Sequence, residues 1–152
     1  MTDRPDNETI ARMFQNMGSN TRRLFGAQFQ SIDAAAGVVT MTFEAKAEFC
    51  NSLGLVQGGL LSAMLDEVMA VAALAHSGMT QVAPTLEMKT CYLSGARQGT
   101  LSGEGRVVKM GRSIAFLEGN LRDPAGNLVV TATATCAMRP FPEELRKKAM
   151  GG

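Results

Sequence analysis

The longest apolar stretch of the chain covers residues 53–75, and within it begins a segment, residues 57–76, that is rich in Leu, Ala and Met, with Asp66 and Glu67 as its acidic residues. These three residue types are strong helix formers, so the segment predicts the longest helix of the chain. Its apolar residues fall on nearly every side of such a helix, which predicts burial on most sides. Ser77 and Gly78 are expected to end the helix.

Alternating apolar and polar residues on both sides of this helix predict β-strands. We expect strands at residues 23–32, 37–45, 81–93, 100–109, 113–123 and 128–139, joined by short turns that contain glycine. Tight turns of this kind favour antiparallel neighbours. Short helices are expected near the two ends of the chain, at residues 9–17 and 142–148.

This order of elements predicts an α+β fold, in which an antiparallel β-sheet is wrapped around the long central helix. One sheet covers one side of that helix, so a partner subunit is the simplest cover for the other side. The chain has 152 residues, which suits a single domain over residues 1–152.

Fifteen basic and fourteen acidic residues give a net charge of +1, so no overall electrostatic field attracts nucleic acid or an anionic membrane surface. A membrane span at residues 53–75 is not expected, because Asp66 and Glu67 would lie inside the bilayer. Residues 1–7 do not resemble a secretory signal, which predicts a cytoplasmic protein. The three cysteines are widely spaced and form no C-x-x-C pair, so no disulfide framework and no metal site are expected.

The most informative stretch runs from Asn51 to Asp66 and contains the glycine pair Gly58 and Gly59. Adjacent glycines cost stability at the start of a helix, and they suit a place where another group comes close to the backbone. The free N–H groups of a first helical turn could stabilise the oxyanion of a thioester under attack. The alternative is that both glycines only permit tight packing against the sheet.

Asp66 lies in the third turn of an otherwise apolar helix, where an ionised carboxylate is costly unless a partner or a function compensates. It is therefore a candidate for the catalytic carboxylate, and a structural ion pair or hydrogen-bonded core residue is the alternative. Glu67 competes for the same role. We prefer Asp66 because Ser62 makes its face of the helix less apolar.

The distance between the two candidate groups suggests a site made by two subunits. Gly58 and Asp66 are eight residues apart, or about 12 Å along a helix. One thioester cannot easily contact both within one chain. If two subunits placed their long helices side by side and antiparallel, Gly58 of one would approach Asp66 of the other.

The stretch resembles the hotdog-fold thioesterases of the PaaI-like, phenylacetic-acid-degradation type. The ordered set that matches their motif is Asn51, Gly54, Gly58, Gly59 and Asp66. The resemblance extends over residues 23–139. It implies the hotdog fold, hydrolysis of a fatty-acyl- or aryl-acyl-CoA thioester without a cofactor, and a homo-oligomer that is a dimer or a homotetramer built as a dimer of dimers.

The resemblance also implies roles for individual residues. Asp66 would act as general base or nucleophile, the Gly58 N–H would polarise the thioester oxygen, and Asn51 would help to position the carboxylate. Thr85 would orient the attacking water from the same subunit as Asp66. Gln57 stands where the family usually has His, and it can donate a hydrogen bond but cannot titrate.

Further residues are expected at the ligand by the same resemblance. Those at the substrate or at the nucleotide and pantetheine of CoA are Gly59, Tyr92, Lys109, Gly111, Arg112 and Ser113. An apolar acyl pocket is expected between subunits, lined by Leu53, Leu60, Met64 and Met88.

Two other functions are weighed against hydrolysis. Because Gln57 replaces the usual His, the chain could be a non-catalytic acyl-CoA-binding hotdog protein. A hotdog hydratase would need a catalytic histidine on the long helix or its approach, but His76, the one histidine, lies near the far end. No G-x-S-x-G motif supports a Ser-His-Asp hydrolase.

Overall fold

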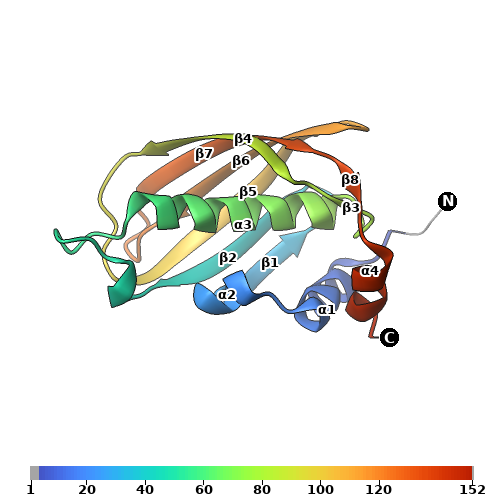
Figure 1. Cartoon of the computed structure of the whole chain (residues 1–152), viewed down its shortest axis with the longest axis horizontal. Helices are drawn as coiled ribbons and strands as arrows, with labels where there is room; N and C mark the ends of the chain where they lie inside the picture. The colour runs from blue at the N-terminus through green and yellow to red at the C-terminus, as the bar shows by residue number, and fades with distance from the viewer. Residues whose placement is uncertain (1–3, 152) are drawn as a thin grey trace.

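A long helix lies across one face of a six-stranded antiparallel sheet that curves around it (Figure 1). The computed structural model describes residues 4–151, so residues 1–3 of the segment that we compared with a secretory signal lie outside the described part. The helix is α3 (Gly58–His76). In sheet order, the strands are β1 (Gln28–Asp33), β2 (Val38–Ala45), β5 (Gly99–Met110), β6 (Ile114–Arg122), β7 (Leu128–Ala137) and β4 (Thr85–Tyr92). This is the α+β hotdog fold that the sequence predicts.

The helix contacts the sheet most closely at Gly105 of β5. A Cβ at this position would lie 2.3 Å from the carbonyl oxygen of Val68, which is a backbone atom of α3. At Gly119 of β6, a Cβ would lie 2.9 Å from the side chain of Met69. Small residues in the sheet therefore let the helix lie directly on the strands, and this contact fixes the height of α3 above the sheet.

One stripe of α3 is not covered by the sheet. It consists of residues that are partly or fully exposed, namely Gly59, Ser62, Ala63, Asp66, Glu67 and Ala70. They recur every three or four residues and therefore share one face of the helix. The far side of α3 is thus open along this stripe within one chain, and its cover by a partner subunit stays a prediction. Among residues 4–151, α3 is the one helix long and apolar enough to cross a membrane, and here it packs on the sheet.

Short helices pack near the carboxyl end of α3 (Figure 1). They are α1 (Asn7–Met17) and α4 (Glu143–Ala149), and the side-chain amide of Asn16 donates a hydrogen bond to the Ala149 carbonyl oxygen at 2.9 Å. A single 3₁₀ turn, η1 (Ala47–Phe49), follows β2.

The strand predicted at residues 23–32 is shorter than expected, because its first residues belong to a helix. This helix is α2 (Asn20–Leu24), and the strand begins at Gln28. Ser19 caps α2, since its hydroxyl accepts a hydrogen bond from the N–H of Arg22 at 3.2 Å. The cap is a local signal for a helix start that the alternation of apolar residues obscured.

The strand predicted at residues 81–93 is divided in two. Its first part is β3 (Gln81–Val82), which leaves the main sheet and pairs with β8 (Arg139–Pro140). Pro84 lies between β3 and β4, and proline has no N–H group for a sheet hydrogen bond. The break lets the chain turn, so that β4 starts beside the middle of α3.

Candidate active site

Asp66 and Thr85 form the centre of the candidate site. The hydroxyl of Thr85 donates a hydrogen bond to Oδ1 of Asp66 at 2.6 Å. Asp66 lies on the uncovered stripe of α3, and Thr85 is the first residue of β4, opposite Cys136 of β7. The structure therefore brings together the two residues that the family resemblance assigns to one subunit.

The neighbouring carboxylate, Glu67, is held in an ion pair. Nε of Arg22 lies 3.8 Å from Oε1 of Glu67, and both side chains are mostly buried, with 11% and 19% exposed. The guanidinium of Arg22 also donates hydrogen bonds to the carbonyl oxygens of Phe14 and Gly18 and lies over the rings of Phe14 and Phe29. Arg22 thus ties the N-terminal helices to α3.

Burial raises the pKa of the Glu67 carboxyl above its ordinary value. The Arg22 guanidinium opposes this rise, and the adjacent charge of Asp66 adds to it. Asp66, in contrast, has no cation within 4.0 Å among residues 4–151. Of the two carboxylates, Asp66 is therefore the one without a cation partner among residues 4–151, and the Thr85 hydroxyl orients it.

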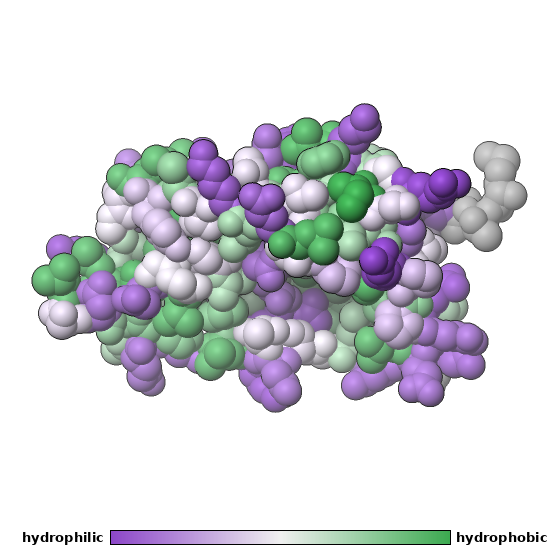
Figure 2. All heavy atoms as spheres, turned by 45° about the horizontal axis from the view of Figure 1, so that its top comes forward, coloured by the Kyte–Doolittle hydropathy of each residue, from purple (hydrophilic) through white to green (hydrophobic). Residues whose placement is uncertain are grey.

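Both carboxylates open into a hollow with a volume of about 460 Å³. Its wall combines α3 with the segment before β4 and with the N-terminal helices, and its apolar members are Phe14, Met17, Ala70, Val71, Leu74, Val82, Ala83 and Pro84. Figure 2 shows a recess in the surface below the centre of the view, with hydrophilic atoms inside it. The volume falls in the range of small-molecule pockets.

The first turn of α3 offers two free amide donors. The N–H groups of Leu60 and Leu61 donate to the Gln57 carbonyl oxygen, whereas those of Gly58 and Gly59 meet no acceptor among residues 4–151. The exposed side chain of Gln57 makes no capping hydrogen bond. Two adjacent donors at the positive end of a long helix can bind an oxyanion.

Asn51 lies in the loop before α3, at the Gly58 end of the helix. Its side-chain oxygen accepts hydrogen bonds from the N–H groups of Leu53 and Leu55 at 2.9 and 3.3 Å. These bonds hold the loop in shape and leave the amide nitrogen of Asn51 free. No contact joins Asn51 to Asp66 within the described part of the chain, so its predicted role requires a second subunit.

Tyr92, at the end of β4, lies against the first turn of α3. Its hydroxyl donates to the Gly58 carbonyl oxygen at 2.9 Å and lies 2.5 Å from Oγ of Ser62. A Cβ at residue 58 would lie 3.1 Å from the Tyr92 ring, so the absence of a side chain at Gly58 makes room for this ring. Gly59 has no atom within 4 Å of such a position. The packing explanation of the glycine pair thus holds for Gly58 but not for Gly59.

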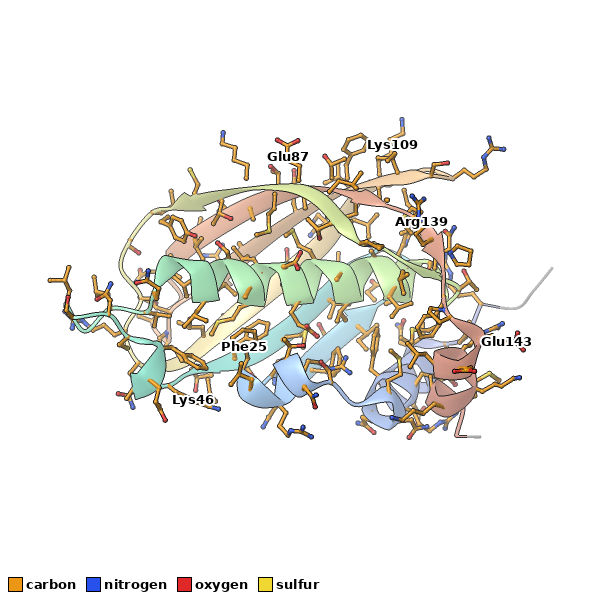
Figure 3. The ribbon with its side chains drawn as sticks, in the orientation of Figure 1. Phe25, Lys46, Glu87, Lys109, Arg139 and Glu143 are labelled. Carbon is orange, nitrogen blue, oxygen red and sulfur yellow. The ribbon has the colours of Figure 1, made fainter. Side chains whose placement is uncertain are left out.

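The end of β5 and the turn to β6 carry the other residues predicted to contact CoA, and all of them are exposed: Lys109, Gly111, Arg112 and Ser113. The carbonyl oxygen of Ser113 accepts a hydrogen bond from the backbone N–H of Met138. The N–H of the preceding residue, Ala137, donates to the carbonyl oxygen of Pro84. This turn therefore lies near the start of β4 and Thr85. Lys109 points away from α3 on the outer side of the sheet (Figure 3).

Within one chain, the predicted site residues form two groups. Gln57, Gly58, Gly59 and Tyr92 lie at the start of α3, and Asp66 and Thr85 lie about 12 Å further along the helix. Sequence reasoning missed Arg22 and the role of Ser62 in the contact with Tyr92. Arg22 is too distant in sequence from Glu67 for any motif spacing to indicate their ion pair. The sequence indicated only that the hydroxyl of Ser62 makes its face of α3 less apolar.

We expect Arg22→Met to destabilise the protein by about 1–3 kcal/mol at pH 7, since Glu67 would keep a buried charge without its cation. The pKa of Glu67 is higher in the folded state than in the unfolded state. At a pH above both pKa values, the ionised Glu67 carboxyl therefore lowers the stability of the fold. That cost disappears as pH falls toward the ordinary value of 4.5. Denaturant unfolding from pH 7.5 to 4.5 should therefore show a deficit that shrinks with acidity.

Arg23→Met is the matched control for this prediction, because Arg23 is exposed and its side chain donates only to Asn20 among the described residues. It should change stability by less than about 0.5 kcal/mol. A deficit in Arg22→Met that is independent of pH would mean that Arg22 acts through its carbonyl contacts and not through the charge of Glu67.

The model of the family described as "Thioesterase superfamily" matches residues 53–130, about half of the chain, including Asp66 and Thr85. The chain therefore belongs to the thioesterase superfamily. A crystal structure of a phenylacetic acid degradation-related protein from Ralstonia eutropha JMP134 is 33% identical, covers 85% of this chain and 98% of that protein, and has a TM-score of 0.76. Within the superfamily, the chain is thus of the PaaI-like type that its motif resembles.

Two further proteins are similar to this chain. Human acyl-coenzyme A thioesterase 13 is 28% identical over 119 residues, which are 76% of this chain and 83% of the human protein. The protein smu.793 of Streptococcus mutans UA159, solved bound to acetyl CoA, is 23% identical over 76% of this chain and 90% of that protein, with a TM-score of 0.69. At that identity the second similarity shows the fold alone.

Proposed function

We propose that this protein hydrolyses acyl-CoA thioesters to a free acid and CoA, with Asp66 as the catalytic carboxylate. The observation that carries the proposal is the hydrogen-bonded pair of Asp66 and Thr85 at the edge of a hollow that can hold an acyl group. Membership of the thioesterase superfamily supports the reaction, and the name of the human relative supports CoA as the thiol.

The chemistry follows from the polar groups around the hollow. Asp66 takes a proton from a water molecule that Thr85 helps to orient, and the water oxygen attacks the thioester carbonyl. The C–S bond then breaks, and the proton passes to the thiolate of CoA as it leaves. Direct attack by Asp66 would instead form an anhydride that water hydrolyses, with the same products.

The oxyanion formed in this step needs donors, and the free pair at Gly58 and Gly59 of the same subunit is too far along the helix. We infer that a second subunit supplies it. In an antiparallel helix pair that matches Gly58 with Asp66, the twofold axis passes near residue 62, their midpoint. Ser62 and Ala63 are small and partly exposed on the uncovered stripe, so the helices can approach closely there.

The sheet offers a second contact for the same partner. β4 is an edge strand of the six-stranded sheet, and its outer edge carries unpaired backbone N–H and C=O groups. A twofold-related β4 could extend the sheet while the two α3 helices pack. Both contacts favour a dimer with two shared sites, and association of dimers into a tetramer belongs to the same proposal.

The acyl group would occupy the hollow beside Asp66. Of the four residues predicted to line an acyl pocket, Met64 is fully buried beneath α3 and Leu53 is 77% exposed in the loop before it. The walls supplied by Phe14, Met17 and Leu74 fit the role better. Both fatty-acyl and aryl-acyl groups match this apolar lining.

Further parts of the proposal rest on the sequence. Exposed Arg112 and its neighbours in the β5–β6 turn would meet the CoA moiety, Gln57 would donate to the thioester oxygen, and Asn51 would reach the partner's site. No metal or redox cofactor takes part, and no nucleic acid or membrane is a partner. We propose the cytoplasm as the location.

The test is release of free thiol from short-chain, medium-chain and aryl-acyl-CoA thioesters, with the molar mass of the same preparation measured by light scattering. We expect turnover of at least one class by an assembly of two or four subunits. A fully active monomer would contradict the shared site. Binding of acyl-CoA without hydrolysis of any substrate would instead favour the non-catalytic acyl-CoA-binding alternative, for which Gln57 in place of a titratable histidine is the supporting observation.

A further inference from the structure

The hydroxyl of Tyr92 can be given a definite hydrogen-bonding state. A carbonyl oxygen only accepts hydrogen bonds, so the one proton of Tyr92 must be donated to Gly58. The hydroxyl of Ser62, 2.5 Å away, must then donate to the Tyr92 oxygen. Oγ1 of Thr90, 3.3 Å from Ser62 Oγ, is a more distant acceptor for the same Ser62 proton. The result is a directed chain of hydrogen bonds from Ser62 through Tyr92 to Gly58.

This chain ends on the peptide unit that carries one of the free amide donors. The carbonyl of Gly58 and the N–H of Gly59 belong to the same planar peptide group. A hydrogen bond to the carbonyl oxygen fixes the plane of that group, and it polarises the group so that its N–H becomes a stronger donor. Tyr92 therefore influences the N–H of Gly59 without itself contacting the oxyanion that this N–H would bind.

We propose that Tyr92 is a positioning residue for the oxyanion donors at the start of α3, an inference that rests on the proposed thioester hydrolysis. Its hydroxyl orients the Gly58–Gly59 peptide group, and its ring packs where a side chain at residue 58 would lie. The sequence predicts a different role for Tyr92, contact with CoA. Its side chain is half exposed, but the hydroxyl is already engaged within the protein.

Steady-state kinetics of Tyr92→Phe distinguish these roles, since the variant keeps the ring and removes the hydroxyl. We expect kcat to fall by roughly three- to tenfold, as for the loss of one neutral hydrogen bond, with KM for acyl-CoA changed less than about twofold. Ser62→Ala should lower kcat in the same direction by a smaller factor. The double variant should be no slower than Tyr92→Phe, because the two hydroxyls act in one chain.

Cys91→Ser is the matched control, because Cys91 is the exposed neighbour of Tyr92 on β4 and lines the outer face of the sheet. Its kcat and KM should equal those of the wild type. A raised KM with unchanged kcat in Tyr92→Phe would overturn the inference in favour of contact with CoA. A lowered melting temperature with kcat and KM both altered would overturn it in favour of a structural role.

A second measurement separates this inference from the proposed function. In the amide NMR spectrum of Tyr92→Phe, we expect the Gly59 resonance to move upfield relative to the wild type, whether or not the protein turns over a thioester. A wild type that hydrolyses nothing would refute the proposed function alone. An unmoved Gly59 resonance would refute the link between Tyr92 and the donors.

Discussion

Asp66→Asn is expected to lower kcat for acyl-CoA hydrolysis by about a thousandfold or more, because the amide cannot accept a proton from water or attack the thioester carbonyl. The asparagine has nearly the same shape and its side-chain oxygen can still accept the hydrogen bond from Thr85. Binding should therefore persist. Thiol release gives kcat, and calorimetric titration with acyl-CoA gives the affinity of the variant.

Glu67→Gln is the matched comparison, since Glu67 is the adjacent carboxylate and also borders the hollow. Its partner is Arg22, and a glutamine oxygen can still face that guanidinium. We expect Glu67→Gln to keep kcat within about tenfold of the wild type, as for a change of one nearby charge. If Glu67→Gln lost activity and Asp66→Asn retained it, the roles of the two carboxylates would be reversed.

The sequence predicts α3 almost to the residue, because a segment rich in Leu, Ala and Met ends at a clear stop. The sheet and its antiparallel pairs follow from alternation and tight turns. The errors occur where a local signal competes with that pattern. Ser19 caps a short helix inside a run of alternating residues, and Pro84 interrupts a strand that its apolar residues suggest is continuous.

The candidate site is predicted less evenly. The contact of Asp66 with Thr85 follows from the family resemblance, since neither residue carries a signal for the other's position. The ion pair of Arg22 with Glu67 joins segments that only the folded chain brings together. For Tyr92, the family resemblance predicts a place in the site. It does not predict the hydrogen bonds of the Tyr92 hydroxyl with Gly58 and Ser62.

The contact between α3 and the sheet leads to the largest expected effect on stability. We expect Gly105→Ala to destabilise the protein by about 3 kcal/mol or more, above most cases of core overpacking. The added Cβ would lie 2.3 Å from the Val68 carbonyl oxygen and 2.9 Å from the backbone nitrogen of Met69. These are backbone atoms of a helix, so no side-chain rotation relieves the overlap and α3 must move off β5. Denaturant unfolding should give a much lower midpoint, or no soluble protein.

Two other glycines make this prediction specific to the backbone contact. At Gly119 an added Cβ meets the flexible side chain of Met69 first, at 2.9 Å, so Gly119→Ala should cost less than Gly105→Ala. At Gly59 it meets nothing within 4 Å, and alanine is the better helix former, so Gly59→Ala should be as stable as the wild type or slightly more so. Equal midpoints for all three variants would mean that α3 can rise from the sheet without cost. In that case, the position of Asp66 relative to Thr85 would not be set by the contact at Gly105.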